Sequence, residues 1–551
     1  MNVPSWVRRP GLAAATVVGV ALLVGLASMT PWLIGSYYDD GTYTMLAKSI
    51  VTGHGYRYLN LPGAPVATHY PPGYPLFLAA LWSLWPEFPA NTALFKLANA
   101  VLLAAVALAV YLLCRRTLGW RPWAAAAVAI VGTLTPAMLV LSSALMSEML
   151  FLTMLIPGLV LAERLVRERG SWREPLVLGV LMGATLMVRS IGLPAVGAVL
   201  LLLALHRRWR DAAIVGVSVA AFMLPWAIWT RTYDALLPAP LFSSYGSYGV
   251  WVKQGFGDRG SGFLLEVVRV NLRAHAMYFG DHFMLVPGKL SSQLAFAGFL
   301  VALLAGAWWL RRRLPVTLLF IGGYSAMLLL WAFQPDRFYY AMDPFYVIVL
   351  VGAALAAIAL WRDPRRARRA TGGALGVVLV LLAAGFVRDT ASGLSHRRWE
   401  RVQRERHESL ADVIGWVTTH TPRDAVIAVE ADPMLYLYTG RTTVPLITMR
   451  ASYYVELPKY DSPLLYGDTR YVIQHYRPDF VVMRGSLTEP GSVVVRSFSD
   501  LPLRVHPRAR FGGNGAVVEL EWLDARPASG SVGAHGSSGG GAGTGSPASG
   551  G

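Results

Sequence analysis

Residues 11–33, GLAAATVVGVALLVGLASMTPWL, form an apolar run without a charged residue, and the acidic pair Asp39 and Asp40 follows shortly after it. Lipid offers no hydrogen-bond partner to the backbone, so a run of about 20 apolar residues is typical of a membrane-spanning helix. A clear A-x-A cleavage site is missing, since Leu26 to Ser28 matches it poorly. We therefore favour a retained membrane anchor over a cleaved signal peptide.

Similar runs recur along the chain and place it among the polytopic membrane proteins. The 551 residues are 54% hydrophobic and only 15% charged, whereas soluble proteins have about 25% charged residues. We expect eleven membrane crossings, the first at 11–33 and the others near residues 93–113, 122–143, 148–163, 175–188, 191–205, 212–229, 292–310, 315–333, 343–361 and 371–387.

Arginine clusters between these runs predict the orientation of the chain. The net charge is +17, but the arginines lie in short groups at the ends of apolar runs. This pattern orients membrane spans and does not indicate a nucleic-acid partner. With the clusters in the cytoplasm, residues 34–91, 230–290 and everything after 388 lie outside. We expect a multi-pass protein of the inner cell membrane, in contact with membrane lipids, with these segments on its periplasmic or extracellular side.

Residues 175–205 need two short helices to keep this orientation, because basic clusters flank both ends of the stretch. Arg189 lies near its centre, between Val188 and Ser190, and Pro194 follows. We expect the two helices to form an up-and-down pair with Arg189 near its outer apex.

The composition changes after residue 390 and predicts a small α/β domain over residues 391–525. Residues 410–417 are typical of an amphipathic helix, and 426–429, 480–483 and 516–520 are short strand-type runs. Residues 526–551 are almost entirely Gly, Ser and Ala and predict a disordered tail. The single cysteine, Cys114, excludes a disulfide framework within the chain.

Asp39 and Asp40 are the first candidate site residues. Adjacent carboxylates repel each other, and burial would raise the pKa of at least one of them, which suits a general base that deprotonates a hydroxyl. Tyrosines such as Tyr38 offer the flat, half-polar faces on which sugars stack. The alternative is that Asp39 or Asp40 is simply the N-cap of an amphipathic helix.

Three further charged residues fall on the same predicted outer face. Glu148 is a lone acid between two apolar runs, and Arg189 and Arg337 are cations at the outer boundary. Charged residues at such positions are costly and are functional candidates. The alternatives are a helix N-terminal acid for Glu148 and a local pair with Asp336 for Arg337. The outer histidines, His69, His275 and His282, match no metal motif and are expected at the polar surface.

Acids, cations and aromatic residues on one outer face suit a transferase that takes a sugar from a lipid-phosphate carrier. No nucleotide-binding loop of the Walker or GxGxxG type is evident. The main alternative is a transporter or flippase of lipid-linked glycans, although such proteins place charges near the midplane and often contain repeats. A third reading, an envelope scaffold, accounts for residues 390–525 but leaves Asp39 and Glu148 without a role.

In the order of these motifs the sequence resembles the bacterial GT-C membrane glycosyltransferases of the protein O-mannosyltransferase and lipid A aminoarabinose transferase type. The resemblance covers roughly residues 10–390. It implies a polytopic α-helical GT-C fold of about eleven transmembrane helices with a small outer α/β domain. The matching positions are Asp39-Asp40 (usually Asp-Glu in the family), Tyr70 to Pro75 with His69-Tyr70 where Glu-Lys is frequent, Glu148, Arg189 and Arg337.

The resemblance implies an inverting transfer from a polyprenyl-phosphate-linked sugar donor to a lipid, glycan or protein acceptor, without a metal or other cofactor. Asp39 would be the general base, with Asp40 and Glu148 orienting it or the acceptor. Arg189 and Arg337 would neutralise the departing phosphate. Substrate contacts are expected from the nearby rings of Tyr38, His69, Tyr70, Tyr74 and Tyr340.

Overall fold

Long apolar helices make up most of the molecule, as the hydropathy predicts. The computed structural model describes residues 10–456, 463–499, 501–512 and 514–524. Within these residues seven helices are long and apolar enough to cross a membrane. They are α1 (Pro10–Ala27), α4 (Thr92–Leu112), which continues as η2 (Leu113–Thr117), α7 (Glu148–Arg167), α10 (Trp209–Asp234), α14 (Lys289–Leu310), α17 (Asp343–Trp361) and α18 (Arg366–Ser395).

The four remaining predicted crossings coincide with shorter or bent helices. These are α8 (Arg173–Val188), α9 (Leu193–Leu205), α15 (Pro315–Leu329) and the pair α5 (Pro122–Thr133) and α6 (Pro136–Ser143), which is bent by 66°. The bend follows from the sequence, because the Thr135 hydroxyl accepts a bond from the Met138 N–H and Pro136 is the first helical residue. Both features start a new helix. Each predicted run is thus helical, while the number of crossings stays a prediction.

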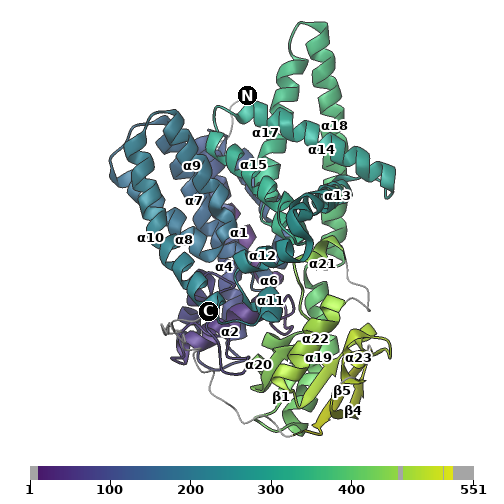
Figure 1. The fold of residues 1–551 in the computed structure, drawn as a ribbon. Coiled ribbons are helices and arrows are strands. Elements are labelled where there is room, and N and C mark those ends of the chain that lie inside the picture. The colour runs from purple at the N-terminus through teal and green to yellow at the C-terminus, as the bar shows by residue number, and fades with distance from the viewer. Residues whose placement is uncertain (1–9, 457–462, 500, 513, 525–551) are drawn as a thin grey trace, which may run out of the picture.

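Further helices, most of them short, fill the segments between these spans. They are α2 (Asp39–Val51), α3 (Gly73–Leu84), η3 (Ser190–Gly192), η4 (Ala239–Leu241), α11 (Phe242–Tyr245), α12 (Tyr248–Arg259), η5 (Gly260–Gly262), α13 (Phe263–Phe283) and α16 (Asp336–Tyr340). Figure 1 shows the C-terminal domain below the helical bundle, next to α2. We call this end of the bundle the domain face.

The C-terminal domain is α/β, as predicted, and contains a five-stranded mixed sheet. The strand order is β2-β1-β3-β5-β4; β1 is parallel to β2 and β3, and β5 is antiparallel to β3 and β4. Its elements are η6 (Arg398–Glu400), α19 (Arg401–His420), β1 (Val426–Val429), α20 (Asp432–Thr439), β2 (Thr442–Pro445), α21 (Ser452–Val455), α22 (Pro463–Tyr476), β3 (Phe480–Met483), η7 (Gly485–Thr488), α23 (Val493–Ser499), β4 (Leu503–Phe511) and β5 (Gly515–Trp522). The predicted tail lies outside the described residues.

Close helix contacts depend on small residues. A Cβ atom on Gly306 of α14 would come within 2.0 Å of the Val349 carbonyl oxygen of α17, so only glycine permits this approach. On α1, Gly25 lies against Ala100 of α4 in the same way, and α1 also packs on α5. Small residues of this kind allow helix backbones to approach closely in membranes. α1 is therefore an integral part of the bundle.

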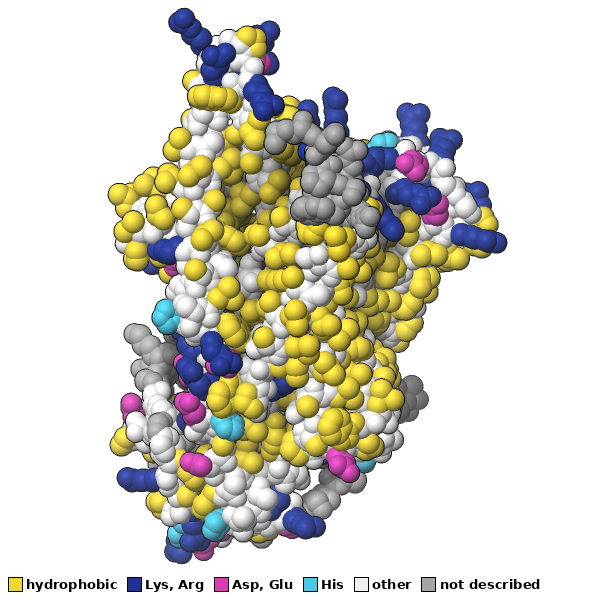
Figure 2. All heavy atoms as spheres, turned by 180° about the vertical axis from the view of Figure 1, so that it is seen from behind, with side chains coloured by type: hydrophobic (Ala, Val, Ile, Leu, Met, Phe, Trp, Pro, Cys, Tyr) yellow, Lys and Arg dark blue, Asp and Glu magenta, His cyan; other side chains and the backbone are white. Residues whose placement is uncertain are grey.

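The surface of the bundle separates apolar from basic side chains. Figure 2 shows a broad hydrophobic belt, with Lys and Arg side chains gathered at the end remote from the C-terminal domain. The arginine clusters of the sequence account for this end, since Arg311 follows α14 and Arg362 to Arg369 join α17 to α18. The belt and the basic end are what a multi-pass membrane protein requires.

Candidate active site

Asp39, the first residue of α2, lies between two partners at the domain face. One carboxylate oxygen accepts a 2.7 Å hydrogen bond from the Tyr70 hydroxyl, and the other forms an ion pair with Arg337 of α16. The Asp39 and Arg337 side chains are 16% and 19% exposed, so the pair is only partly shielded from water. Arg337 thus pairs across the fold with Asp39, and the alternative of a local pair with Asp336 is wrong.

Asp40 has a different environment from its neighbour. Its buried carboxylate accepts backbone N–H bonds from Gly35 at 2.9 Å and Tyr37 at 3.0 Å. Burial raises the pKa of Asp40 to about 6, and these backbone bonds oppose the rise. The two adjacent carboxylates therefore have different roles. Asp40 stabilises the turn that begins α2, and Asp39 contacts Tyr70 and Arg337. Neither is the N-cap of α2, because that position belongs to Tyr38.

Glu148 and Arg189 form a second acid–base pair. Glu148 is the first residue of α7, its side chain is 1% exposed, and a carboxylate oxygen lies 3.0 Å from the Arg189 guanidinium. Arg189 also donates a 2.8 Å bond to the Ser147 hydroxyl, which lies 3.2 Å from the Tyr43 hydroxyl. Glu148 is thus both a helix N-terminal acid and the buried partner of a cation.

The break that carries Arg189 has the predicted form. α8 ends at Val188, Arg189 is extended at φ −149° and ψ 117°, and η3 begins at Ser190. The extended residue turns the guanidinium toward the N-terminus of α7 instead of continuing the helix. The expectation of two short helices with Arg189 at the break between them is confirmed, while their up-and-down course and the outer position of Arg189 stay predictions.

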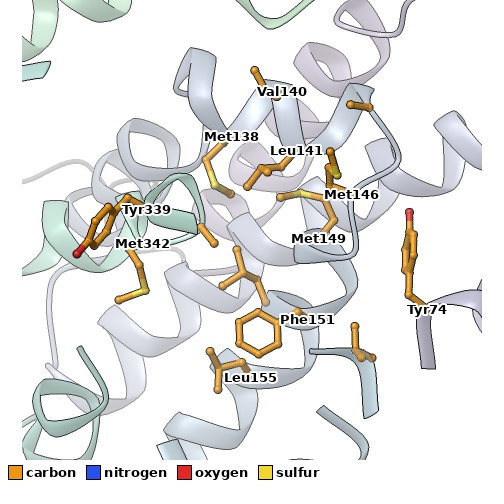
Figure 3. Packing of buried hydrophobic residues seen from close by; sticks show 14 of the residues in the cluster. Tyr74, Met138, Val140, Leu141, Met146, Met149, Phe151, Leu155, Tyr339 and Met342 are labelled. Carbon is orange, nitrogen blue, oxygen red and sulfur yellow. The ribbon is translucent and has the colours of Figure 1, made fainter. Parts of the chain in front are cut away.

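A tightly packed core fixes the turn in front of Glu148. Figure 3 shows Met138 and Leu141 of α6 close to Met146 and Met149 around the turn between α6 and α7. All four side chains are buried, with relative exposures of 1% or less. Such packing leaves little freedom to the backbone at Ser147 and Glu148. The packing around this turn therefore restrains the position of the acid.

Phe338 lies near both arginines. The centre of its ring is 5.6 Å from the Arg189 guanidinium carbon and 5.8 Å from that of Arg337. Both distances permit a cation–π attraction. Both positive charges therefore lie close to one aromatic side chain, and two cations so near to each other favour the binding of an anionic group beside them.

Two cavities adjoin this centre. The smaller, of about 240 Å³, is mainly apolar and is lined by Tyr43, Tyr70, Pro71, Val188, Arg189, Ser190, Ile191, Leu193, Tyr248, Met327, Leu328, Trp331 and Phe338. The larger, of about 830 Å³, lies between the bundle and the C-terminal domain. It contains the cations Arg337, Arg398, Arg401 and Arg406 and the acids Asp281, Asp336, Asp389 and Glu430. Arg189 borders the first cavity, and Arg337 borders the second.

The aromatic residues singled out in the sequence are distributed over this region. Tyr70 lines the smaller cavity, and Tyr38 and Tyr340 line the larger one. His69 bonds through Nδ1 to the Gly246 carbonyl oxygen at 2.6 Å. Tyr74 is buried in the core, where its hydroxyl donates to Asn99 at 3.1 Å, and it borders neither cavity.

The expectation of surface histidines is wrong for His275. This side chain is 7% exposed and bonds through Nδ1 to the Asn271 carbonyl oxygen of its own helix. His282 pairs with Asp389 at 2.9 Å and borders the larger cavity. In the described part of the chain, no three His, Cys, Asp or Glu side chains come together in a way that could hold a metal ion.

Sequence reasoning missed Tyr43, Ser147, Tyr248 and Phe338. Tyr43 carried a usable signal, because it lies one helical turn after Asp39 and must share a face of α2 with it. Phe338 directly follows Arg337, but nothing in the sequence indicates that its ring reaches Arg189. Tyr248 belongs to α12, far along the chain, and only the fold brings it to the smaller cavity.

Comparison with known proteins identifies the architecture. No protein-family model matches the sequence, and curated protein sequences give no match. The structure resembles that of ArnT from Cupriavidus metallidurans bound to undecaprenyl phosphate, with a TM-score of 0.52 and 15% identity over 92% of this chain and 97% of that chain. Apo ArnT gives a TM-score of 0.50 and 14% identity over the same shares. The Archaeoglobus fulgidus oligosaccharyltransferase in complex with Zn and sulfate gives a TM-score of 0.48 and 14% identity. The match covers 86% of this chain and 68% of that chain.

The chain has the GT-C fold. The predicted resemblance to GT-C membrane glycosyltransferases is therefore confirmed at the level of the fold. Within this GT-C chain, Asp39, Glu148, Arg189 and Arg337 come from α2, α7, the α8–α9 break and α16, and meet at one place on the domain face.

Proposed function

We propose that this protein is a membrane glycosyltransferase that moves a sugar from a polyprenyl-phosphate carrier to an acceptor hydroxyl or phosphate, with inversion. The observation that carries the proposal is the arrangement of two acid–cation pairs near Phe338, in each of which the arginine borders one cavity. The ArnT structure with undecaprenyl phosphate supports a lipid-phosphate donor through the shared fold.

The smaller cavity suits the donor carrier. Its walls are apolar side chains of α9, α15 and the α8–α9 break, which fit an isoprenoid chain, and Arg189 stands among them to pair with the phosphate. The larger cavity, which lies between the bundle and the C-terminal domain and has charged side chains in its lining, suits the acceptor. Asp39 lies between them through its bonds to Tyr70 on one side and Arg337 on the other.

In the proposed reaction the acceptor oxygen attacks the anomeric carbon of the donor sugar while the bond from that carbon to the phosphate oxygen breaks. Asp39 takes the acceptor proton as general base. The departing phosphate gains negative charge, which Arg189 and Arg337 stabilise. Before the donor binds, Arg337 neutralises Asp39; a carrier phosphate would compete for this arginine and leave the Asp39 carboxylate free to accept a proton.

The proposed location is the inner cell membrane, with the domain face toward the periplasm or exterior. The arginine clusters at the opposite end support this orientation. A transporter remains the second candidate of the sequence analysis, but the site supports it less. Asp39 and Glu148 are first residues of helices at the domain face and do not lie in the middle of a span.

The test uses membranes from a strain that lacks the protein, so that the unidentified acceptor is present. The purified protein is added with undecaprenyl-phosphate-linked hexose or pentose, and release of undecaprenyl phosphate is measured. Asp39→Asn should reduce transfer by about 10²-fold or more, while Asp211→Asn, at the opposite end beside Arg208, should keep it. Full activity of Asp39→Asn would contradict the assignment. Mass spectrometry of the products identifies the acceptor.

A further inference from the structure

Asp432, the first residue of α20, is a buried carboxylate that connects the C-terminal domain with the bundle. It is 0% exposed. Its Oδ2 atom accepts a 3.0 Å bond from the Asn60 amide and a bond from the Tyr245 hydroxyl, and the Asn60 amide also lies 2.6 Å from that hydroxyl. Three segments distant in the sequence thus meet in one hydrogen-bonded cluster. The cluster takes no part in the reaction proposed above.

Backbone contacts reinforce this cluster. The Thr443 N–H of β2 donates to the Asn60 carbonyl oxygen at 2.7 Å, and the Thr443 hydroxyl donates to the Asp432 carbonyl oxygen at 2.8 Å. Burial raises the pKa of Asp432 to about 7, while hydrogen bonds from Tyr245 and Asn60 act in the opposite direction. Hydrogen bonds between buried polar groups favour the one arrangement of the chain in which they form.

One route leads from Asp432 to Asp39 through the end of α11. The Tyr245 carbonyl oxygen accepts a 2.7 Å bond from the Tyr58 hydroxyl, which in turn accepts the N–H groups of Thr68 and His69 at 3.2 and 3.0 Å. The next residue is Tyr70, whose hydroxyl donates to Asp39. The segment that carries the hydrogen-bond donor to Asp39 is therefore anchored through Tyr245.

A second route leads through the backbone directly before Asp39. Gly35 adopts φ +101°, and a Cβ atom there would lie 2.6 Å from the Cβ of Met434 in α20. Tyr38 has φ 68° and ψ −55°, an unfavourable conformation for a residue with a side chain, and its hydroxyl is buried. Such a conformation persists only where the surroundings impose it. Here α20 packs against α2, as Figure 1 also shows.

The residues just before Asp432 face the larger cavity. Glu430 and Ala431 belong to its wall, together with Tyr38 from the first loop. One turn of the C-terminal domain, residues 430–432, therefore borders the proposed acceptor cavity. The same turn leads into the contacts with the two segments that flank Asp39.

We propose that the C-terminal domain contributes to the active site and that its Asp432 is a positioning residue for the segments around Asp39. Through Tyr245 and Asn60 it fixes the segment that carries Tyr70, and the helix that it begins, α20, packs against the backbone directly before Asp39. This role rests on the proposed function for its link to sugar transfer, but the mechanical connection stands on the contacts alone. The carboxylate acts as a hydrogen-bond acceptor and touches no substrate.

The experiment compares full-length variants in one detergent by hydrogen–deuterium exchange and by transfer kinetics. Asp432→Ala removes the acceptor, and Tyr245→Phe removes one donor with little change of shape. Both should increase amide exchange in residues 35–45 and 56–70. Both should lower kcat between about tenfold and a hundredfold, as small misplacements of a catalytic group do, with KM for the undecaprenyl-phosphate-linked sugar within about twofold, since neither residue borders the donor cavity. Asp432→Asn keeps one acceptor oxygen and should restore both properties.

The matched control is Asp468→Ala. Asp468 is a buried carboxylate of the same domain that pairs with Arg450, which contacts α12 through Asp258. It should affect neither the exchange of the two loops nor kcat. Equal effects of Asp468→Ala and Asp432→Ala would mean that Asp432 contributes only to the stability of the domain, and this would overturn the proposal. Unchanged amide exchange in residues 35–45 and 56–70 of Asp432→Ala would overturn it as well. If the wild type transfers no sugar, the proposed function fails, and the exchange data alone still decide the mechanical link.

Discussion

Tyr70 and Asp39 lie 31 residues apart in the sequence, yet the Tyr70 hydroxyl donates a 2.7 Å bond to the Asp39 carboxylate. This bond orients the carboxylate that faces Arg337 on its other side. Two independent partners thus restrict how the proposed base can rotate.

Tyr70→Phe should lower kcat by about tenfold or more, because a hydrogen bond to a charged group contributes about 1.5–3 kcal/mol. The unfolding temperature should change little, since the ring packing remains. Tyr74→Phe is the matched control, because its hydroxyl bonds to Asn99 in the core. A larger loss of kcat in Tyr74→Phe than in Tyr70→Phe would contradict the orienting role.

Arg189→Gln should destabilise the protein because it leaves the buried Glu148 carboxylate without its cation. Removal of one partner of a buried pair costs about 3–5 kcal/mol. The double variant Glu148→Gln/Arg189→Gln should recover most of the unfolding temperature but no transfer activity. Arg164→Gln removes an exposed pair and should cost about 0–1 kcal/mol. A double variant as unstable as the single one would show that the charge of Glu148 is not the cause.

Ile191→Trp should obstruct the smaller cavity, of which Ile191 is a wall residue. Binding of undecaprenyl phosphate should weaken by about tenfold or more, which corresponds to 1.4 kcal/mol. Native mass spectrometry or a fluorescent-lipid titration measures the change. Leu205→Trp, on the exposed end of α9, is the control and should bind as the wild type does. Undiminished binding by Ile191→Trp would place the carrier elsewhere.

Asp40 should make the stability of the protein depend on pH. Burial raises its pKa from 3.8 to about 6 in the folded state, so the folded protein holds this proton more tightly than the unfolded chain. The associated stability is fully present below about pH 4 and is lost as the pH rises through about 6, a difference of about 3 kcal/mol.

The variant Asp40→Asn removes this titration. It should flatten the dependence of the unfolding temperature between pH 4 and 6, although loss of one acceptor oxygen for Gly35 or Tyr37 lowers stability at every pH. Thermal unfolding of both proteins across this range is the measurement. An unchanged slope would mean that another group causes the dependence.

Hydropathy and charge were sufficient to predict the helical bundle and the break at Arg189, because both follow from local constraints on a chain in lipid. The C-terminal sheet was predicted only in part. β1, β3 and β5 contain β-branched runs. β2 has only four residues, three of them β-branched, and ends in Pro445, while β4 contains three arginines and Pro507 at an irregular register. Their strand character comes from pairing with neighbours, which local sequence patterns do not reveal.

The candidate site shows the same limit. Its charged residues were found because acids and cations near membrane spans are rare and costly. Their pairing was not found, because Asp39 and Arg337 are separated by most of the bundle in sequence and meet only through the fold. For the same reason the sequence did not reveal that Asp40 is a structural brace.

The two helical stretches that flank Arg189 are short in relation to a bilayer. α8 has 16 residues, as does the stretch from Ser190 to Leu205, so each stretch is about 24 Å long. The hydrocarbon layer is about 30 Å thick. This hydrophobic mismatch should thin the leaflet beside Arg189 and draw headgroups toward the guanidinium. A lipid phosphate could then reach the smaller cavity from the side without leaving the bilayer, and acyl-chain length should affect how readily it does so.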